Sequence, residues 1–268
     1  VLLREKAFCA LSVIVLALGI CGVTTTFSVV NRVMLRRVSF PNSDRMVSVS
    51  FIDPTSKNFF GQNGQVSPMD FEEVRPKQQS FELMAGYING ATVNVTYEGT
   101  PKRYTGAYVT DTFLRVLGVS PSMGRDFSPE DNKEGAEKVA LIGYGVWQRD
   151  FGGTPDILGK ALKIWGSPAT VIGVMPKGFA FPVNEEWWVP LFREFPVRAR
   201  TDPRVTNPSV LALLKRGVSL DQANAEMTTV ARQLADAYPD TNKQFNTGKV
   251  EPLLKTYTPL PLRGTLVT

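Results

Sequence analysis

The chain has 268 residues, of which 43% are hydrophobic and 21% are charged, and its formal net charge is +5. Such a mild positive charge, spread along the whole chain, does not indicate a nucleic-acid-binding protein. The chain contains no histidine, which excludes Ser-His-Asp triads, Cys-His pairs and the histidine-containing helices of zinc proteases.

The first element in chain order is a long apolar segment, because no residue from Ala7 to Val30 carries a charge. At about 1.5 Å per residue, a helix of this length spans roughly 36 Å and crosses the ~30 Å hydrocarbon core of a bilayer with some tilt. It is too long for a buried core helix or a cleaved signal peptide. We therefore predict a transmembrane helix over residues 7–35, after a cytoplasmic flank over residues 1–6. Both cysteines, Cys9 and Cys21, lie in this helix, so the rest of the chain holds neither a disulfide nor a thiolate metal site.

Local charge does not settle the orientation of the predicted helix. The basic residues before it are Arg4 and Lys6, and those after the apolar run are Arg32, Arg36, Arg37 and Arg45. Counted in this way, the positive-inside rule would place the large domain in the cytoplasm. Because the chain begins at Val1 without an initiator methionine, upstream residues could be missing from the count. Small side chains on the helix also predict a partner span outside this chain; they are Ala17, Gly19, Cys21 and Gly22.

The segment after the predicted span begins with a strand and a short capped helix. Residues 46–52 alternate between apolar and polar side chains, which predicts a strand, and residues 53–65 are polar and glycine-rich, which predicts a loop. Ser67 is a suitable N-cap, and Pro68 favours the first helical position. We expect this helix to end at Pro76, after little more than two turns.

Short strands and short helices are predicted for the middle of the chain. Residues 91–97 and 102–109 are separated by a glycine-containing turn, which predicts a hairpin. Residues 111–118 have the pattern of a short helix that ends at a glycine. A buried strand is predicted over residues 139–142, followed by a helix over residues 144–151 that carries two aromatic side chains on one face.

A second hairpin and the clearest helix follow. Residues 161–165 and 169–174 flank the turn Gly166-Ser167 and are predicted to pair. A helix begins at Ser219, which forms a capping box with Gln222, and apolar residues recur at helical spacing until a proline ends it. Short strands mixed with short helices, without regular alternation, predict an α+β fold.

Three pairs of adjacent acidic residues could act as catalytic acids and bases or bind Ca²⁺. These pairs are Glu72–Glu73, Glu130–Asp131 and Glu185–Glu186. We expect them to face solvent, because adjacent acids usually do and because residues 128–134 lack the spacing of an EF-hand loop. The stretch Gly153–Ala161 has one residue too many between its glycines for a Walker motif and lacks the Ser or Thr that holds Mg²⁺. The sequence therefore predicts no catalytic, cofactor-binding or metal-ligating residue.

Several large aromatic residues are close together in the sequence. Trp187 and Trp188, with Phe179, Phe181 and Phe192 nearby, could line a hydrophobic groove for a substrate. A domain without disulfides needs large side chains in its core. We therefore favour a place in the core for these residues over a groove.

A series of short motifs extends over most of the chain in one order. They are residues 113–121 (FLRVLGVSP), 124–127, 139–149 (VALIGYGVWQR), 151–153, 157–160, 171–176 (VIGVMP), 178–182, 188–191 and 217–220. Together they resemble the extracytoplasmic core domain of MacB-like ABC transporter permeases. The span and its exit, at residues 17–20, 27–31, 35–36 and 44–45, are similar to the large soil-bacterial branch of that family. The sequence departs from the family pattern at residues 210–216, where a more marked Arg-Leu-Lys-Pro ending is expected.

The resemblance implies a permease of the bacterial inner membrane whose first helix is followed by a large outer domain and then by three more helices. By this comparison the chain stops before the second span. Residues 36–268 would form an extracytoplasmic mixed α/β domain, with a porter-like part and an inserted smaller subdomain. This orientation takes precedence over the local charge count. The implied partners are a separate cytoplasmic ABC ATPase subunit or domain, a second permease copy (as a dimer) and a periplasmic adaptor. Such proteins couple ATP hydrolysis to movement of the outer domain, for export or efflux.

Two other classes of function stay open at this point. A single-span, membrane-anchored sensor or ligand-binding domain that acts without an ATPase would have the same span and the same domain. A membrane-anchored hydrolase is disfavoured by the missing histidine, although lysine or carboxylate chemistry is not excluded. We expect the chain not to be an enzyme. The residues identify neither the transported substrate, nor whether the task is export or the extraction of lipid or lipoprotein, nor the oligomeric state.

Overall fold

The computed structural model of the chain describes residues 17, 40–56, 64–253 and 255. Residues 40–256 form one compact unit, and the description below concerns this domain. Among the described residues, no helix is long and apolar enough to cross a bilayer. The transmembrane helix predicted over residues 7–35 lies outside the described residues, apart from Ala17.

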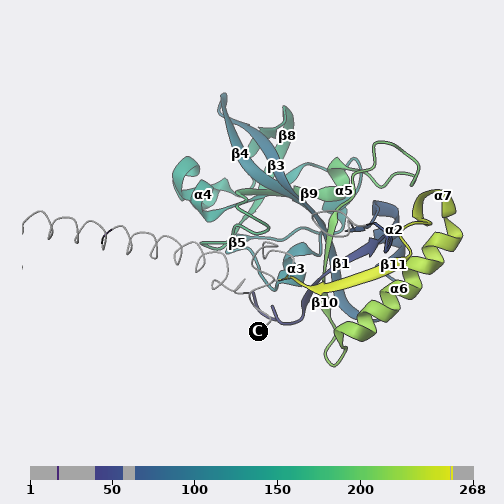
Figure 1. Cartoon of the computed structure of the whole chain (residues 1–268). Coiled ribbons are helices and arrows are strands. Elements are labelled where there is room, and N and C mark those ends of the chain that lie inside the picture. Colours follow the sequence, from purple (N-terminus) through teal and green to yellow (C-terminus); the bar gives the residue numbers. More distant parts are fainter. Residues whose placement is uncertain (1–16, 18–39, 57–63, 254, 256–268) are drawn as a thin grey trace, which may run out of the picture. The chain divides into compact units, whose positions relative to one another are not determined.

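The domain combines short helices with short strands (Figure 1), which confirms the predicted mixed α/β composition. The elements of its first half are β1 (Met46–Ile52), β2 (Gly64–Gln65), α2 (Pro68–Val74), β3 (Phe81–Tyr97), β4 (Thr100–Val109), α3 (Phe113–Leu117), β5 (Met123–Gly124), the 3-10 helix η2 (Glu130–Asn132) and β6 (Val139–Ile142). Those of its second half are α4 (Tyr144–Phe151), the 3-10 helix η3 (Pro155–Ile157), β7 (Ala161–Ile164), β8 (Ser167–Val174), β9 (Trp187–Pro190), α5 (Leu191–Glu194), β10 (Ser209–Leu214), α6 (Leu220–Ala237), α7 (Pro239–Asn242) and β11 (Thr247–Pro252).

The strands of the described residues belong to one sheet of 11 strands, in the order β11-β1-β10-β3-β4-β9-β6-β8-β5. β2 pairs with β1, and β7 pairs with β3 and β8. The pairs β4–β9 and β6–β8 are parallel, and the other pairs are antiparallel. The long strand β3 contacts β10 through its first part and β7 through its last residues, and its register with β4 shifts between Ile88 and Ala91. β3 therefore connects the two ends of the sheet.

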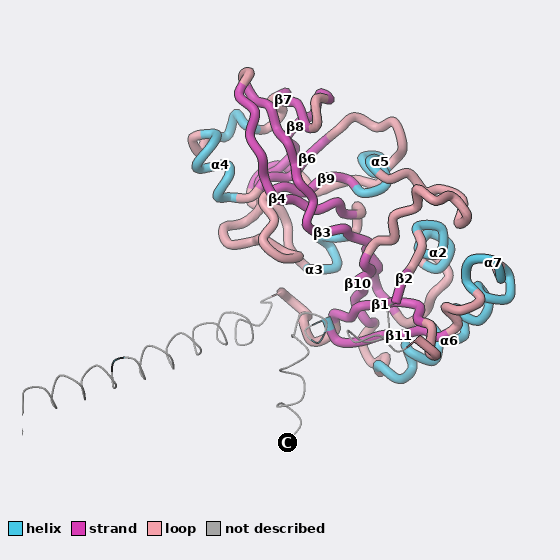
Figure 2. Tube along the Cα trace, turned by 45° about the horizontal axis from the view of Figure 1, so that its top comes forward, coloured by secondary structure: helices cyan, strands magenta, loops and turns pink. Residues whose placement is uncertain are grey.

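A first hydrophobic core lies under α6, between this helix, α2 and the strands β1, β10, β11 and the start of β3 (Figure 2). α6 contributes four fully or almost fully buried residues at helical spacing, which are Ala223, Met227, Ala231 and Leu234. The helix begins with the predicted capping box, in which the Gln222 backbone N–H donates to the Ser219 hydroxyl and the Ser219 N–H donates to the Gln222 side chain. The helix predicted from Ser219 to the residue before Pro239 is thus confirmed.

A second hydrophobic core is formed by α4, the last part of β3, and strands β4, β6, β7, β8 and β9, at the opposite end of the sheet in Figure 2. Its buried residues fall between positions 93 and 189, whereas those of the first core fall between 47 and 84 and between 210 and 250. The chain thus leaves the first core, builds the second core and then returns. This is the pattern of one subdomain inserted into another.

Most local predictions agree with the structure, including the bounds of the strand at residues 46–52 and of the helix at residues 144–151. Two predictions need correction. β3 begins at Phe81 rather than at residue 91. Four consecutive residues, 84–87, are buried there, and a strand covered on both faces does not show the alternation that reveals a strand. The turn of the second hairpin is Trp165-Gly166, both with positive φ (49° and 80°), rather than Gly166-Ser167.

Candidate functional site

The described domain begins at Phe40, five residues after Leu35, the predicted end of the membrane helix. The ring of Phe40 packs edge-to-face on Phe181 at 5.3 Å between ring centroids and lies 6.1 Å from the ring of Phe179. Pro41, the next residue, packs against Gly118 at the end of α3. The contact is close: a Cβ added to Gly118 would lie 3.2 Å from the Pro41 Cβ. The first residues that the structure describes after the predicted span, Phe40 and Pro41, are therefore packed onto the domain.

Residues 40–45 form a turn that leads into β1, and we call it the linker turn. It is closed by two backbone hydrogen bonds, from Ser43 to Phe40 and from Arg45 to Asn42. At its end the Arg45 guanidinium donates to the Leu214 carbonyl at 2.7 Å and pairs with Glu82 at 3.0 Å. The linker turn is thus attached to the aromatic rings at one end and to β10 and β3 at the other.

The rings that receive Phe40 form a compact group, which we call the aromatic cluster. It consists of Phe40, Tyr87, Phe113, Phe179, Phe181 and Trp188. Phe181 lies 6.1 Å from Tyr87 of β3 and 5.9 Å from Phe113 of α3. Trp188 of β9 lies 5.1 Å from Phe179 and donates through its indole nitrogen to the Phe181 carbonyl at 2.9 Å. The cluster therefore links the linker turn to β3, α3 and β9, and through these strands to both cores.

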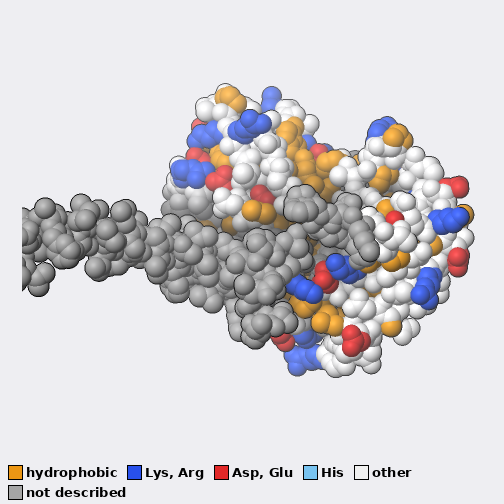
Figure 3. Space-filling model, viewed as in Figure 1, with side chains coloured by type: hydrophobic (Ala, Val, Ile, Leu, Met, Phe, Trp, Pro, Cys, Tyr) orange, Lys and Arg blue, Asp and Glu red, His pale blue; other side chains and the backbone are white. Residues whose placement is uncertain are grey.

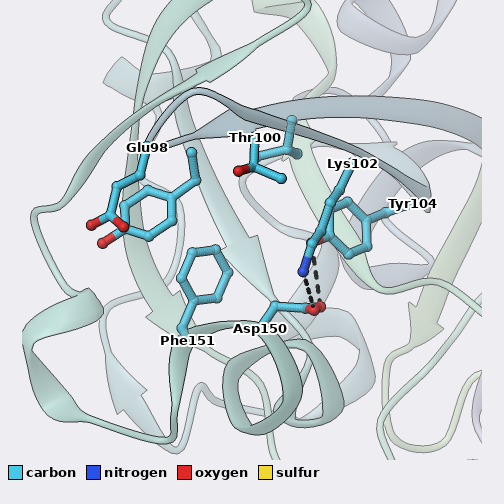
Figure 4. A pocket seen from close by; sticks show the side chains of 8 residues that line it. Glu98, Thr100, Lys102, Tyr104, Asp150 and Phe151 are labelled. Atoms are coloured by element: carbon cyan, nitrogen blue, oxygen red, sulfur yellow. Dashed lines mark hydrogen bonds and ion pairs between the residues drawn. The ribbon is translucent and has the colours of Figure 1, made fainter.

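A cavity of about 230 Å³ lies beside the turn between β3 and β4 (Figure 4). At its edge Asp150 of α4 accepts hydrogen bonds from Lys102 at 2.7 Å, from Tyr104 at 3.2 Å and from Arg149 at 3.1 Å. Burial opposes ionisation of Asp150, but the hydrogen bonds from Lys102 and Arg149 outweigh it and lower its pKa. Burial raises the pKa of Tyr104, and the Asp150 carboxylate raises it further. These charged groups already pair with one another, so they fix the hairpin to α4.

Two of the acidic residues that the sequence expects to face solvent are buried instead, so that expectation was wrong for them. Asp131 is 8% exposed and Glu185 is 4% exposed. Asp131 accepts two hydrogen bonds from Arg125, at 2.7 and 3.0 Å, and one from the Ser128 backbone. Glu185 accepts from the Gly90 backbone at 3.3 Å, beside the register shift of β3, and its burial raises its pKa. Both carboxylates stabilise backbone turns.

The remaining acidic candidates are not brought together into one site. Glu73 pairs with Arg200 at 2.8 Å, Glu186 pairs with Arg149 at 3.1 Å, and Glu130 is an exposed residue. Among the residues that the structure describes, no group of three or more acidic or cysteine side chains could hold a metal ion. On the face shown in Figure 3, basic and acidic side chains are interspersed.

The two adjacent tryptophans are both 0% exposed. The predicted place in the core is thus confirmed for Trp187 and Trp188, and the groove alternative was wrong for them. Trp187 packs on Tyr104 in the second core, at 5.5 Å. Phe192 packs instead on Phe71 beside the first core, at 6.0 Å. The five aromatic residues that are close in sequence therefore do not share one surface.

Sequence reasoning named only part of the aromatic cluster. Phe179, Phe181 and Trp188 were candidates, but Phe40, Tyr87 and Phe113 were not connected to them. The one signal in the sequence was a single phenylalanine in a polar, turn-rich stretch immediately after the predicted span. An aromatic side chain buries a large apolar surface when it packs, so a phenylalanine at this place is a candidate contact with the domain.

Comparisons with known proteins identify the fold. A family model described as a MacB-like periplasmic core domain matches residues 9–230. No curated protein matches the chain. A solved structure of the extracellular domain of the noncanonic ABC-type transporter YknZ from Gram-positive bacteria is similar, with 18% identity, a TM-score of 0.53, and coverage of 77% of this chain and 99% of that one. The periplasmic region of MacB from Actinobacillus actinomycetemcomitans has 12% identity and a TM-score of 0.57, with coverage of 88% of this chain and 99% of that one.

Proposed function

The chain belongs to the family of MacB-like periplasmic core domains, the extracytoplasmic domains of ABC transporter permeases, and from this premise we propose that it relays ATP-driven motion out of the membrane. The observation that carries the proposal is the attachment of the linker turn to the aromatic cluster. Phe40 is the first described residue after the predicted span, and its ring packs on Phe181. Motion of the membrane helix would therefore reach the domain through this contact.

The way the linker turn is held supports a mechanical role. It is fixed at two points, through the Phe40 ring and through the Arg45 guanidinium. Closely packed interiors are stiff and transmit displacement instead of absorbing it. Trp188 and Phe113 in the aromatic cluster are 0% exposed, so a displacement of Phe40 acts on rings that have no room to yield.

The proposal includes partners and a location. We propose that the protein resides in the bacterial inner membrane, works with a cytoplasmic ABC ATPase subunit or domain and a second permease copy, and contacts a periplasmic adaptor during export or efflux. We also propose that the chain is not itself an enzyme, in keeping with acidic candidates that pair with arginines instead of meeting in one site.

Spin-label distance measurements on the native membrane protein, purified with its associated proteins, test the relay. Cys9 and Cys21 are replaced by serine, and a single label is placed at the exposed positions Arg232 on α6 or Lys163 on β7. We expect the distance between two permease copies to differ between the ATP-trapped and ADP states at both positions. Phe40→Ala should reduce that difference. Phe151→Ala, which removes a ring that packs on Tyr97, is the matched control and should not.

Two results would count against the relay. If no ATPase co-purifies and ATP leaves the distances unchanged, the anchored sensor or ligand-binding domain becomes the better description. If an ATPase is present but Phe40→Ala and Phe151→Ala have equal effects, motion does not pass through the aromatic cluster.

A further inference from the structure

The loop between β8 and β9, residues 175–186, exposes an apolar side chain beside the aromatic cluster. Among the described residues, Val183 and Val197 are the large hydrophobic side chains exposed to solvent, at 65% and 40%. A single exposed valine needs no explanation by itself. Val183, however, comes two residues after Phe181, the residue on which the Phe40 ring packs. The exposed valine therefore belongs to the same loop that receives the first described residue after the predicted span.

The backbone on both sides of Val183 is fixed by hydrogen bonds to the domain. Before it, the Phe181 carbonyl accepts from the indole nitrogen of Trp188 at 2.9 Å. After it, the Asn184 carbonyl accepts from the Thr105 hydroxyl at 2.7 Å. Trp188 is fully buried in β9, and Thr105 belongs to β4. The valine is thus held outward by a firm loop, and its exposure is a property of the fold.

The length of the chain before Phe40 limits how far this loop can lie from the bilayer. Phe40 follows Leu35, the predicted end of the membrane helix, by five residues, and five residues reach at most ~18 Å. The headgroup layer on each side of the hydrocarbon core is about 5–7 Å thick. Phe40 packs on Phe181 at 5.3 Å between ring centroids. The chain therefore keeps the loop within reach of the membrane surface.

The charges in and around the loop suit an anionic lipid surface. Lys177 is an exposed residue of the loop, and residues 36–37, just before the linker turn, are both arginine. Of the acidic residues in the loop, Glu185 is buried and Glu186 pairs with an arginine of α4. The linker turn adds one exposed acid, Asp44. An apolar side chain accompanied by basic ones is the pattern of segments that bind at a membrane interface.

The small size of the exposed apolar surface favours lipid over a protein partner. A stable protein interface buries about 800 Å² on each partner, far more than one valine supplies, whereas a chain already tethered to the bilayer needs little added contact to stay on it. We propose that the β8–β9 loop docks on the outer surface of the membrane, with Val183 inserted at the boundary between headgroups and acyl chains and Lys177 beside lipid phosphates. This inference rests on the proposed location in the membrane but needs neither ATP nor an ATPase.

Collision measurements on spin-labelled protein test the docking. The native membrane protein, purified with its associated proteins, is placed in nanodiscs of phosphatidylcholine and phosphatidylglycerol, with Cys9 and Cys21 replaced by serine. The matched control for a label at Val183→Cys is a label at Val197→Cys, also an exposed valine, because the segment after α5 lies away from the linker turn (Figure 1). The label at 183 should collide at least threefold less with a neutral water-soluble nickel chelate than the control label, and more with oxygen. Adding Lys177→Glu should remove most of that difference.

Two outcomes would overturn the docking and leave the proposed relay standing. Equal nickel collision rates at the two labels would place the loop in water. Protection of the label at 183 from both nickel and oxygen, with spin–spin broadening between two permease copies, would show that a second copy covers the loop. A third outcome would refute the docking and the proposed location together: a protein that stays in solution without detergent and does not enter nanodiscs has no membrane span.

Discussion

The contact between Phe40 and Phe181 can be measured directly with a double-mutant cycle. The two rings are edge-to-face, with an interplanar angle of 86° and a centroid distance of 5.3 Å. Such a pair contributes about 0.5–1.5 kcal/mol beyond the burial of its surface. Phe181 is 8% exposed, so Phe181→Ala should cost about 3–5 kcal/mol. Phe40 is only partly buried, and Phe40→Ala should cost about 1–2 kcal/mol.

The assay is the free energy of unfolding of the domain in denaturant, measured for the wild type, both single variants and the double variant of the full chain. The double variant should be more stable than the sum of the single losses predicts, by the coupling energy of about 0.5–1.5 kcal/mol. A second cycle with Phe40 and Phe151 provides the control, because Phe151 packs on Tyr97 at the far end of β3. Additivity within about 0.3–0.5 kcal/mol is expected there. Additivity in both cycles would refute a specific contact between the linker turn and the aromatic cluster.

Three further predictions concern the stability of the same domain. Arg200→Met removes a guanidinium that is 9% exposed and lies 2.8 Å from two carboxylates of α2, so the free energy of unfolding in denaturant should fall by about 3–5 kcal/mol. The control Arg204→Met, at an exposed side chain, should not move the unfolding midpoint. Gly248→Ala would place a Cβ 2.3 Å from the α6 backbone, so thermal unfolding should show a lower Tm. A Cβ at Gly145 in α4 would meet only open space, so Gly145→Ala should stabilise the domain by about 0.5–1 kcal/mol. Burial raises the pKa of Asp126 to about 6, so the wild type should lose stability relative to Asp126→Asn as pH rises from 4 to 7, which thermal melts at each pH would show.

The elements that the sequence predicts well are those whose signals lie within a few neighbouring residues. Ser67 caps α2 by accepting from the Asp70 N–H at 3.1 Å, as the Ser-Pro pair indicates. α3 ends at Gly118, which has φ 66°. The capping box of α6 is formed by residues three apart. In each case the signal is the type of residue at the end of the helix and its hydrogen bonds to residues within five positions, so no knowledge of the tertiary fold is needed.

The parts that the sequence does not predict depend on contacts between distant residues. In the sequence, Asp131 and Glu185 look like ordinary surface acids. Their burial depends on hydrogen bonds from Arg125 and from the Gly90 backbone, and the local sequence does not show that these partners replace solvent. The start of β3 is hidden because other elements cover both of its faces. Asn132 is buried, and the partner of its side-chain oxygen is the backbone N–H of Phe192, 60 residues away. Hydrophobic pattern and local propensity contain none of this information.

The position of the aromatic cluster follows from the insertion of one core into the other. A chain that leaves the first core, builds the second and returns must pass between them, and the long strand β3 does so through a register shift near Gly90. Tyr87 lies immediately before that shift, and Phe181 packs on Tyr87. Under the proposed relay, a force applied at Phe40 would reach the place where the two cores join. Such a force would turn one core relative to the other, whereas a force applied in the middle of either core would shift the domain as one body.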